Sequence, residues 1–249
     1  MSLTGATGPC ATGNAAYTIY NDNGPVMLDA TCSNRQALLP PETIGGLSVS
    51  RKVFVPSNDE FARWLNVFTN NTGAAISFSM VTSNNLGSDA NTVLVTTSDG
   101  DAVAEATDLW ITSFQNFSGT NSTDPRLGQV LQGPDAGTPL SGVNFVNGDD
   151  NPFWSYAVTV AAGQTAIIAN FVTGQPSRAD AAAKAAELVG LPANATQCMT
   201  APELAQVVNF AAVAGVVRSV PVGGHDGWIA LGALMALLAM FALRPRHTA

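Results

Sequence analysis

The stretch ARWLNVFTNNTGAAISFSMVT, residues 62–82, decides the fold class of this chain. In its second half large apolar side chains alternate with smaller ones, and Ile76, Phe78 and Met80 share one face. A period of two residues is typical of a β-strand with one buried face. Asn70-Asn71-Thr72-Gly73 precedes this run, and because Asn and Gly tolerate a positive φ it predicts a hairpin turn.

Similar short runs continue on both sides of this stretch, separated by turn signals such as Ser98-Asp99-Gly100-Asp101. The candidate strands are residues 17–20, 48–55, 62–69, 75–82, 91–97, 108–114, 153–160 and 165–171. Seven or eight short strands at this spacing predict an antiparallel β-sandwich. We assign this mainly β domain to residues 17–175, after a low-complexity lead-in at residues 1–16 that we interpret as truncated.

Two short α-helices are predicted after the sandwich. Ser177 is a good N-cap for residues 178–189, an alanine-rich stretch that ends at Gly190. Thr200-Ala-Pro-Glu203 is a capping box that opens a second helix over residues 201–210. Because the first helix carries few large apolar residues, we expect it at the edge of the sandwich.

The charge balance excludes several classes of function. The chain of 249 residues has 10 Lys or Arg and 18 Asp or Glu, which gives a formal charge of −8. Such a chain cannot neutralise a run of phosphates, so nucleic acid is not an expected partner. The two histidines, His225 and His247, stand near the C-terminus. The body therefore lacks the histidine that Ser-His-Asp, Cys-His and His-ligated zinc sites require.

The C-terminal part contains a long apolar run. Residues 228–243, WIALGALMALLAMFAL, carry no charge over 16 positions and are followed by Arg-Pro-Arg-His. A helix of this length spans ~24 Å, close to the ~30 Å of a hydrocarbon core. The run predicts one transmembrane helix within residues 223–249, with the basic tail cytoplasmic and the body outside. Residues 1–20 contain no secretion signal, so we expect the native protein to begin further upstream.

A short motif before this run resembles a known class of sorting signal. Val220-Pro221-Val222-Gly223-Gly224, a polar gap, Trp228, the apolar run and a basic tail with Arg244 and Arg246 resemble the C-terminal signals of bacterial surface proteins. The nearest type is IPTL-CTERM, which is related to PEP-CTERM, although Val-Pro-Val-Gly stands here in place of Ile-Pro-Thr-Leu and Gly223-Gly224 also suits GlyGly-CTERM. The resemblance implies that the segment anchors the protein in the membrane and that an envelope-sorting peptidase is its partner.

On this interpretation the two-helix segment, residues 176–210, leads through a linker and sorting motif at residues 211–222 into the anchor. Within the body, residues 49–70 resemble a module of large bacterial surface proteins, as do residues 85–89, 97–101, 108–110 and 162–165. That resemblance implies an extracellular structural unit.

Acidic residues in the loops form the one plausible ligand set for a metal. Six aspartates could supply oxygens to Ca²⁺: Asp89, Asp99, Asp101, Asp108, Asp149 and Asp150. Asp99-Gly-Asp101 begins like a calcium-binding loop, but Trp110 stands at the twelfth position, where a glutamate is needed. We therefore favour the interpretation that these aspartates make turns, and we expect no cofactor.

A sugar site is the alternative that the aromatic residues suggest. Asp149-Asp150 lies close to Trp154, and paired carboxylates can hydrolyse glycosides. Adjacent residues on one loop seldom oppose each other, so an enzyme is not expected. Trp64, Trp110 and Trp154 could form a carbohydrate platform, but their places in strand-like runs favour the core.

Two further features leave alternatives open. Arg51 and Arg63 stand in apolar strands, and we expect one of them to form a buried ion pair with an aspartate such as Asp108. Cys10, Cys32 and Cys198 allow three single bridges. A Cys10–Cys32 bridge would close a loop of about twenty residues, worth ~3 kcal/mol. A Cys32–Cys198 bridge would tie the first strand region to the second helix.

Together these patterns predict a non-enzymatic envelope protein with a structural or adhesive role at the bacterial cell surface. Its expected partners are the membrane, the sorting peptidase, and surface polysaccharides or other surface proteins. A carbohydrate- or calcium-binding module carried by the same anchor is the alternative, followed by an envelope hydrolase.

Overall fold

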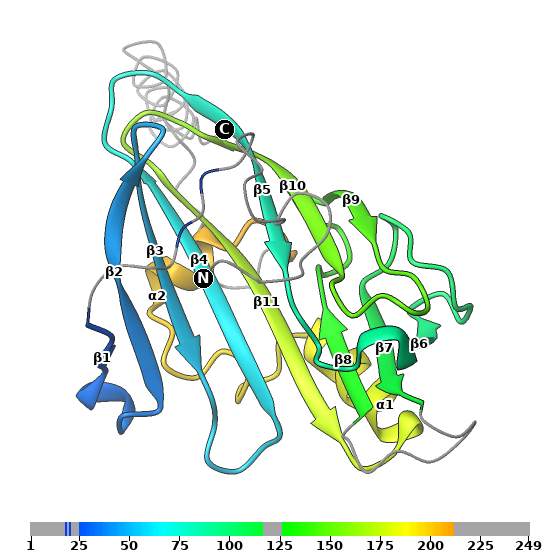
Figure 1. The fold of residues 1–249 in the computed structure, drawn as a ribbon. Helices are drawn as coiled ribbons and strands as arrows, with labels where there is room; N and C mark the ends of the chain where they lie inside the picture. Colours follow the sequence, from blue (N-terminus) through cyan, green and yellow to red (C-terminus); the bar gives the residue numbers. More distant parts are fainter. Residues whose placement is uncertain (1–17, 19, 21–24, 117–125, 212–249) are drawn as a thin grey trace, which may run out of the picture. The chain divides into compact units, whose positions relative to one another are not determined.

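The structure is a computed structural model that describes residues 18, 20, 25–116 and 126–211 (Figure 1). The chain divides into residues 1–216 and 217–249, and every described residue belongs to the first unit. Among the described residues no helix has both the length and the hydropathy needed to cross a bilayer. The predicted span at residues 228–243 and the sorting motif lie outside the described residues.

The described strands form two antiparallel sheets. The eight-stranded sheet has the order β1-β2-β3-β4-β11-β8-β7-β6, and the three-stranded sheet has the order β5-β10-β9. The bounds are β1 Met27–Leu28, β2 Gln36–Ile44, β3 Leu47–Phe54, β4 Phe61–Asn70, β5 Ile76–Ser83, β6 Thr92–Thr97, β7 Trp110–Gln115, β8 Arg126–Val130, β9 Leu140–Asn144, β10 Phe153–Val160 and β11 Thr165–Gln175. The mainly β, antiparallel class predicted from the sequence is confirmed, in a sandwich-like arrangement.

The core lies on both faces of the large sheet. Successive strand residues point to opposite faces, and in β11 Ile167 and Ile168 are both fully buried but belong to different clusters. Ile168 packs with Phe68 and Tyr156 between the two sheets. Ile167 packs on the opposite face with Leu65, under α1 (Arg178–Val189) and the chain that follows it. Figure 1 shows both helices behind the large sheet.

The predicted hairpin at residues 70–73 is wrong. β4 belongs to the large sheet and β5 to the small one, so this turn carries the chain from one sheet to the other. Asn70 holds the corner, since its side-chain amide donates to the carbonyl oxygens of Ala74 (2.8 Å) and Val160 (2.9 Å) and its Oδ1 accepts from Thr72 N (2.9 Å). The hydrogen-bonding groups of this turn therefore pair with one another and with β10. They do not close a two-stranded hairpin.

Most predicted strands agree with the structure within a few residues, but β1, β2, β8 and β9 were not predicted. In β2 the register against β3 shifts between Leu39 and Glu42, where Pro40 and Pro41 interrupt the ladder. Thr18 and Tyr20, the described residues of the expected strand 17–20, are not in a strand. Tyr20 is held instead by a hydrogen bond from its hydroxyl to Pro40 O (2.8 Å).

Both helices begin as predicted. Ser177 caps α1, and Thr200 with Glu203 forms the capping box of α2 (Ala201–Gln206). The short 3₁₀ segments η2 (Ala30–Cys32) and η3 (Asp89–Asn91) complete the elements of the described residues. α2 ends before residue 210 because the following chain is extended, and Val208 N donates to Ile167 O (2.9 Å).

α1 lies on the face of the large sheet and not at its edge as expected. It packs over β7, β8 and β11, with Ala181, Ala185 and Leu188 fully buried. A Cβ added to Gly128 in β8 would meet Ala181 O at 3.0 Å and Ala185 Cβ at 3.2 Å. The small residues of the helix thus permit a close approach to the sheet. We expected an edge position because the helix has few large apolar residues, but a close approach does not require them.

Candidate functional site

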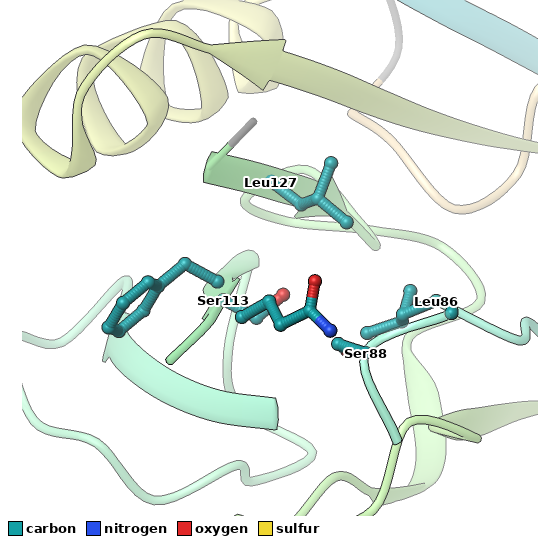
Figure 2. A pocket seen from close by; sticks show the side chains of 7 residues that line it. Leu86, Ser88, Ser113 and Leu127 are labelled. Carbon is teal, nitrogen blue, oxygen red and sulfur yellow. The ribbon is translucent and has the colours of Figure 1, made fainter. Parts of the chain in front are cut away.

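A shallow pocket lies between β7, β8 and the segment that follows β5 (Figure 2). Its volume is about 230 Å³ and its lining consists of Leu86, Gly87, Ser88, Ser113, Phe114, Gln115 and Leu127. Ser113 and Leu127 are direct partners in the β7–β8 ladder. Figure 2 shows Leu86 and Ser88 coming from a different segment of the chain than these two.

Main-chain hydrogen bonds hold the segment after β5 in place. Asn84 N donates to Pro152 O (3.2 Å) and Leu86 N to Asp150 O (2.8 Å), so the antiparallel pairing of β5 with β10 continues past the strand ends. Gly87 then takes a φ of +73°, and its N–H donates to Asn85 Oδ1 (3.0 Å). This Asx turn directs Ser88 toward β6, where its hydroxyl lies 2.6 Å from that of Thr92.

A buried polar side chain lies directly behind the pocket wall. Gln129 in β8 is 1% exposed, and its Nε2 lies 3.4 Å from Ser113 Oγ. Its Oε1 has no hydrogen-bond partner in the described part of the chain. Directly after the end of β8, the Leu131 carbonyl accepts from Tyr156 Oη (2.5 Å) and from Asn170 Nδ2 (3.2 Å).

The space between the sheets thus contains a group of neutral polar side chains. Asn170 Nδ2 also donates to Tyr156 Oη (2.8 Å). Burial raises the pKa of Tyr156, although the hydrogen bond from Asn170 opposes this shift. Asn209 contacts the same carbonyl group: its Oδ1 accepts from Ala169 N (2.8 Å) and its Nδ2 donates to Leu131 O (2.9 Å). These neutral contacts hold β11 to the end of β8.

The pocket offers binding groups rather than acids and bases. Its seven lining residues include two hydroxyls and one carboxamide, together with Leu and Phe side chains. All of these side chains are uncharged at neutral pH. The arrangement can therefore hold an uncharged ligand by hydrogen bonds and apolar contact.

The aspartates proposed as calcium ligands divide between separate loops. Asp99 and Asp101 both accept from Thr97 Oγ1, at 2.7 and 3.0 Å, and the hydrogen bond from Thr97 lowers the pKa of Asp99. Asp108 accepts from Glu105 N at 2.8 Å and Ser98 Oγ at 3.2 Å. These three carboxylates stabilise the β6–β7 connection, as the turn interpretation requires.

The other three aspartates lie elsewhere. Asp149 and Asp150 precede β10, where Asp149 accepts from Asn151 N (2.9 Å) and Asp150 from Asn151 Nδ2 (2.6 Å). Asp89 stands in η3. Across residues 25–116 and 126–211, no three His, Cys, Asp or Glu side chains gather in an arrangement that could hold a metal ion.

The three tryptophans do not form a common platform. Trp154 is 2% exposed in the core between the sheets, whereas Trp110 packs against the cluster on the opposite face of the large sheet. Trp64 is half-buried in β4. Trp154 is therefore a core residue, as expected. Trp110 and Trp154 lie on opposite faces of the large sheet and cannot belong to one carbohydrate platform.

Neither arginine forms the expected ion pair with Asp108. Arg63 is fully buried, and its guanidinium donates to Ala195 O (2.7 Å), Gln197 O (2.8 Å) and Gln36 Oε1 (3.1 Å). Arg51 Nε donates to Asn66 Oδ1 (2.8 Å). Carbonyl and amide oxygens thus replace the expected carboxylate, because they lie where the strands bring the guanidinium groups.

Among the open cysteine pairings, the structure contains Cys32–Cys198. The bridge joins η2 to the chain between the two helices across 166 residues. The residues predicted to carry the sorting signal all lie outside the described residues: Val220, Pro221, Val222, Gly223, Gly224, Trp228, Arg244 and Arg246. The pocket and Gln129 were not predicted, since serine and glutamine in short strands carry no signal of their own.

No family model and no curated protein matches this chain. Among solved structures it is similar to a polysaccharide lyase, with a TM-score of 0.41 and 12% identity over 62% of this chain and 23% of that one. It is also similar to a protein named as a kojibiose phosphorylase from the human microbiome, with a TM-score of 0.35 and 10% identity over 66% of this chain and 21% of the other. The chain thus spans less than a quarter of either protein.

Proposed function

We propose that this protein is an exported, non-enzymatic surface protein with a structural or adhesive role, anchored by its C-terminal segment. The observation that carries the proposal is the Cys32–Cys198 disulfide. Disulfides form and persist in oxidising compartments and are rare in the cytosol of mesophiles. A long-range bridge in an acidic, weakly charged body therefore supports export.

The bridge acts together with Arg63 on the same segment of chain. Arg63 binds the carbonyl groups of Ala195 and Gln197, and Cys198 follows directly after them. A covalent bond and a buried cation thus hold the connection between α1 and α2 against the large sheet. Such a body suits a load-bearing or adhesive module outside the cell.

The C-terminal segment supplies the anchor in this proposal. Its apolar run from Trp228 is long enough to enter a bilayer, and Arg244 and Arg246 would hold the tail on the cytoplasmic side. The Pro221 motif would present the cleavage site to the sorting peptidase. The body would then remain in the envelope after transfer.

Fractionation of the native host tests the proposal. The protein as its native gene encodes it is compared with a chain truncated after Ser219, and thiols are alkylated before lysis. We expect the full chain in the envelope with Cys32 and Cys198 protected from alkylation, and the truncated chain released. Uncut protein in the cytosol with both thiols alkylated would overturn the proposal, and so would a truncated chain that stays membrane-bound.

A further inference from the structure

The connection between α1 and α2, residues 190–199, lies against the face of the large sheet that carries the helices, and we call it the strap. Ala195 in the strap is fully buried, in the cluster that contains Phe61 and Leu65. Among the described residues, no main-chain N–H group of the strap donates to a strand, since those that are bonded pair within the strap or with the end of α1. The strap is therefore not part of the sheet and depends on other links to stay in place.

Side-chain links fasten the strap to the rest of the body. Within the described residues there are three such links: Arg63 to the carbonyl groups of Ala195 (2.7 Å) and Gln197 (2.8 Å), Asn194 to Asp59, and Cys198 to Cys32. Only the Cys32–Cys198 link is covalent. Without it, the strap keeps a few hydrogen bonds and the packing of its small apolar side chains.

The backbone is strained at both ends of the strap. Leu191 has a φ of +49° and Cys198 a φ of +64°, in the left-handed region that residues other than glycine seldom adopt. Such conformations persist only where the surrounding structure enforces them. At Cys198 the bridge itself fixes the strained residue, so reduction removes the constraint at the place where the strain is stored.

Opening the strap does not leave a charge without solvation. Arg63 is fully buried, and its Nε has no hydrogen-bond partner in the described part of the chain. Burial lowers the pKa of this guanidinium to about 10, because a low-dielectric environment disfavours the charged form. When the strap moves away, water replaces the two carbonyl groups and reaches Nε as well. Hydration of Arg63 therefore offsets part of the packing that opening loses.

We propose that the Cys32–Cys198 bridge is a redox switch for the strap. With the bridge formed the strap is closed over Arg63, and with the bridge reduced it opens while both sheets and α1 stay folded. A thiolate of a dithiol attacks Cys198 Sγ, the more exposed of the two sulfurs, and Cys32 leaves as a thiolate. The second thiol of the reagent then releases Cys198, so the protein gains two electrons and two protons and the reagent becomes a cyclic disulfide. This inference concerns the body alone and does not depend on the proposed anchor.

Hydrogen exchange of the purified full chain, followed by mass spectrometry with and without dithiothreitol, tests the switch. Peptides from the strap are compared with peptides from β4 and β11. We expect the strap amides to exchange about tenfold or more faster after reduction, and those of β4 and β11 to change by less than about twofold. Equal exchange of the strap in both states would overturn the inference. A matching acceleration in β4 and β11 would overturn it too, because the whole body would then unfold on reduction.

Labelling with phenylglyoxal, which modifies accessible arginine side chains, gives a second readout. Arg63 should react about tenfold or more faster in the reduced protein, because the strap no longer covers it. Arg51 is the matched control, since it is half-buried in β3 and donates to Asn66 instead of the strap. Its rate should be the same in both states. Unchanged labelling of Arg63, or an equal gain at Arg51, would contradict the switch.

Two variants separate the bridge from other effects of the reductant. Cys198→Ser cannot form the bridge and should show fast exchange of the strap with and without dithiothreitol. Cys10→Ser keeps the bridge and should behave like the wild type in both conditions. A strap that stays protected in Cys198→Ser would overturn the inference even if the wild type responds to dithiothreitol.

Discussion

Arg63 Nη1 lies 2.7 Å from the carbonyl oxygen of Ala195, a residue 132 positions further along the chain. The contact joins the central strand β4 to the connection between the two helices. Burial lowers the pKa of the Arg63 guanidinium from 12.5 to about 10, and Glu203 opposes that shift. The side chain therefore stays charged at neutral pH, and main-chain carbonyl groups solvate it.

Replacing Arg63 should destabilise the protein strongly. Arg63→Met removes three hydrogen bonds that the guanidinium donates. The carbonyl oxygens of Ala195 and Gln197 then lose this donor. We expect the free energy of unfolding to fall by about 3–5 kcal/mol, measured by urea denaturation. Arg35→Met is the matched control, since Arg35 also donates to two carbonyl groups, those of Val55 and Pro56, but is exposed. Equal losses in both variants would contradict the special role of Arg63.

Breaking the disulfide should lower stability by a similar amount. The Cys32–Cys198 bridge closes a loop of 166 residues, and chain entropy predicts a gain of about 5 kcal/mol for a loop of that size. Cys198→Ala should therefore melt about 10 °C or more below the wild type, and a reductant should abolish the difference. Cys10→Ser should leave the melting temperature unchanged. A large effect of Cys10→Ser and none of Cys198→Ala would mean that Cys32 pairs with Cys10 instead.

Gly128 should not tolerate a side chain. An added Cβ would lie 2.9 Å from Thr173 Cγ2 and 3.0 Å from Ala181 O, so α1 would have to move away from β8. Gly128→Ala should lower the free energy of unfolding by about 1–3 kcal/mol. Gly73→Ala is the control, because nothing lies within 4 Å of its added Cβ, and it should stay within about 0.5 kcal/mol of the wild type. An unchanged free energy of unfolding in Gly128→Ala would show that α1 is not held so close to β8.

Glu203 should make stability depend on pH in the acid range. Burial alone would raise the pKa of Glu203, but the ion pair with Lys52 (2.6 Å) and hydrogen bonds from Thr200 outweigh it, so the folded-state pKa lies below 4.5. The folded state thus binds this proton less readily than the unfolded chain. The stabilisation is fully present above pH 4.5 and is lost as the pH falls through the folded-state pKa.

The measurement is the urea midpoint of wild type and Glu203→Gln over a pH series. The variant should be less stable at neutral pH, and the gap should close on acidification. Lys52→Met, which removes the other partner, should show the same closing gap. A gap that stays constant at acid pH would contradict the assignment to this carboxylate.

The agreement between sequence and structure is greatest where the signal is local. The capping box of Thr200 and Glu203 and the N-cap Ser177 each need only a few neighbouring residues, and both form. The alternation of Ile76, Phe78 and Met80 likewise predicted the buried face of β5. The strand β2 was not predicted, and it contains Pro40 and Pro41, which the sheet accommodates by a shift of register.

The candidate site could not be predicted from the same kind of signal. Ser113, Gln129 and Leu86 come from separate parts of the chain, and polar residues in strands usually face solvent. Gln129 is buried only because the small sheet covers that face of the large one. The pairing of Cys32 with Cys198 is decided in the same way, by the connection of the helices returning to η2.

The sequence by itself determined the antiparallel β class, the helix starts, the apolar C-terminal run and the absence of histidine from the body, because each depends on local pattern or composition. The tertiary structure alone decided that β4 and β5 belong to different sheets, which oxygens receive Arg63, and which polar groups meet behind Ser113. These outcomes depend on strand order, and strand order follows from how distant segments bury their apolar faces together.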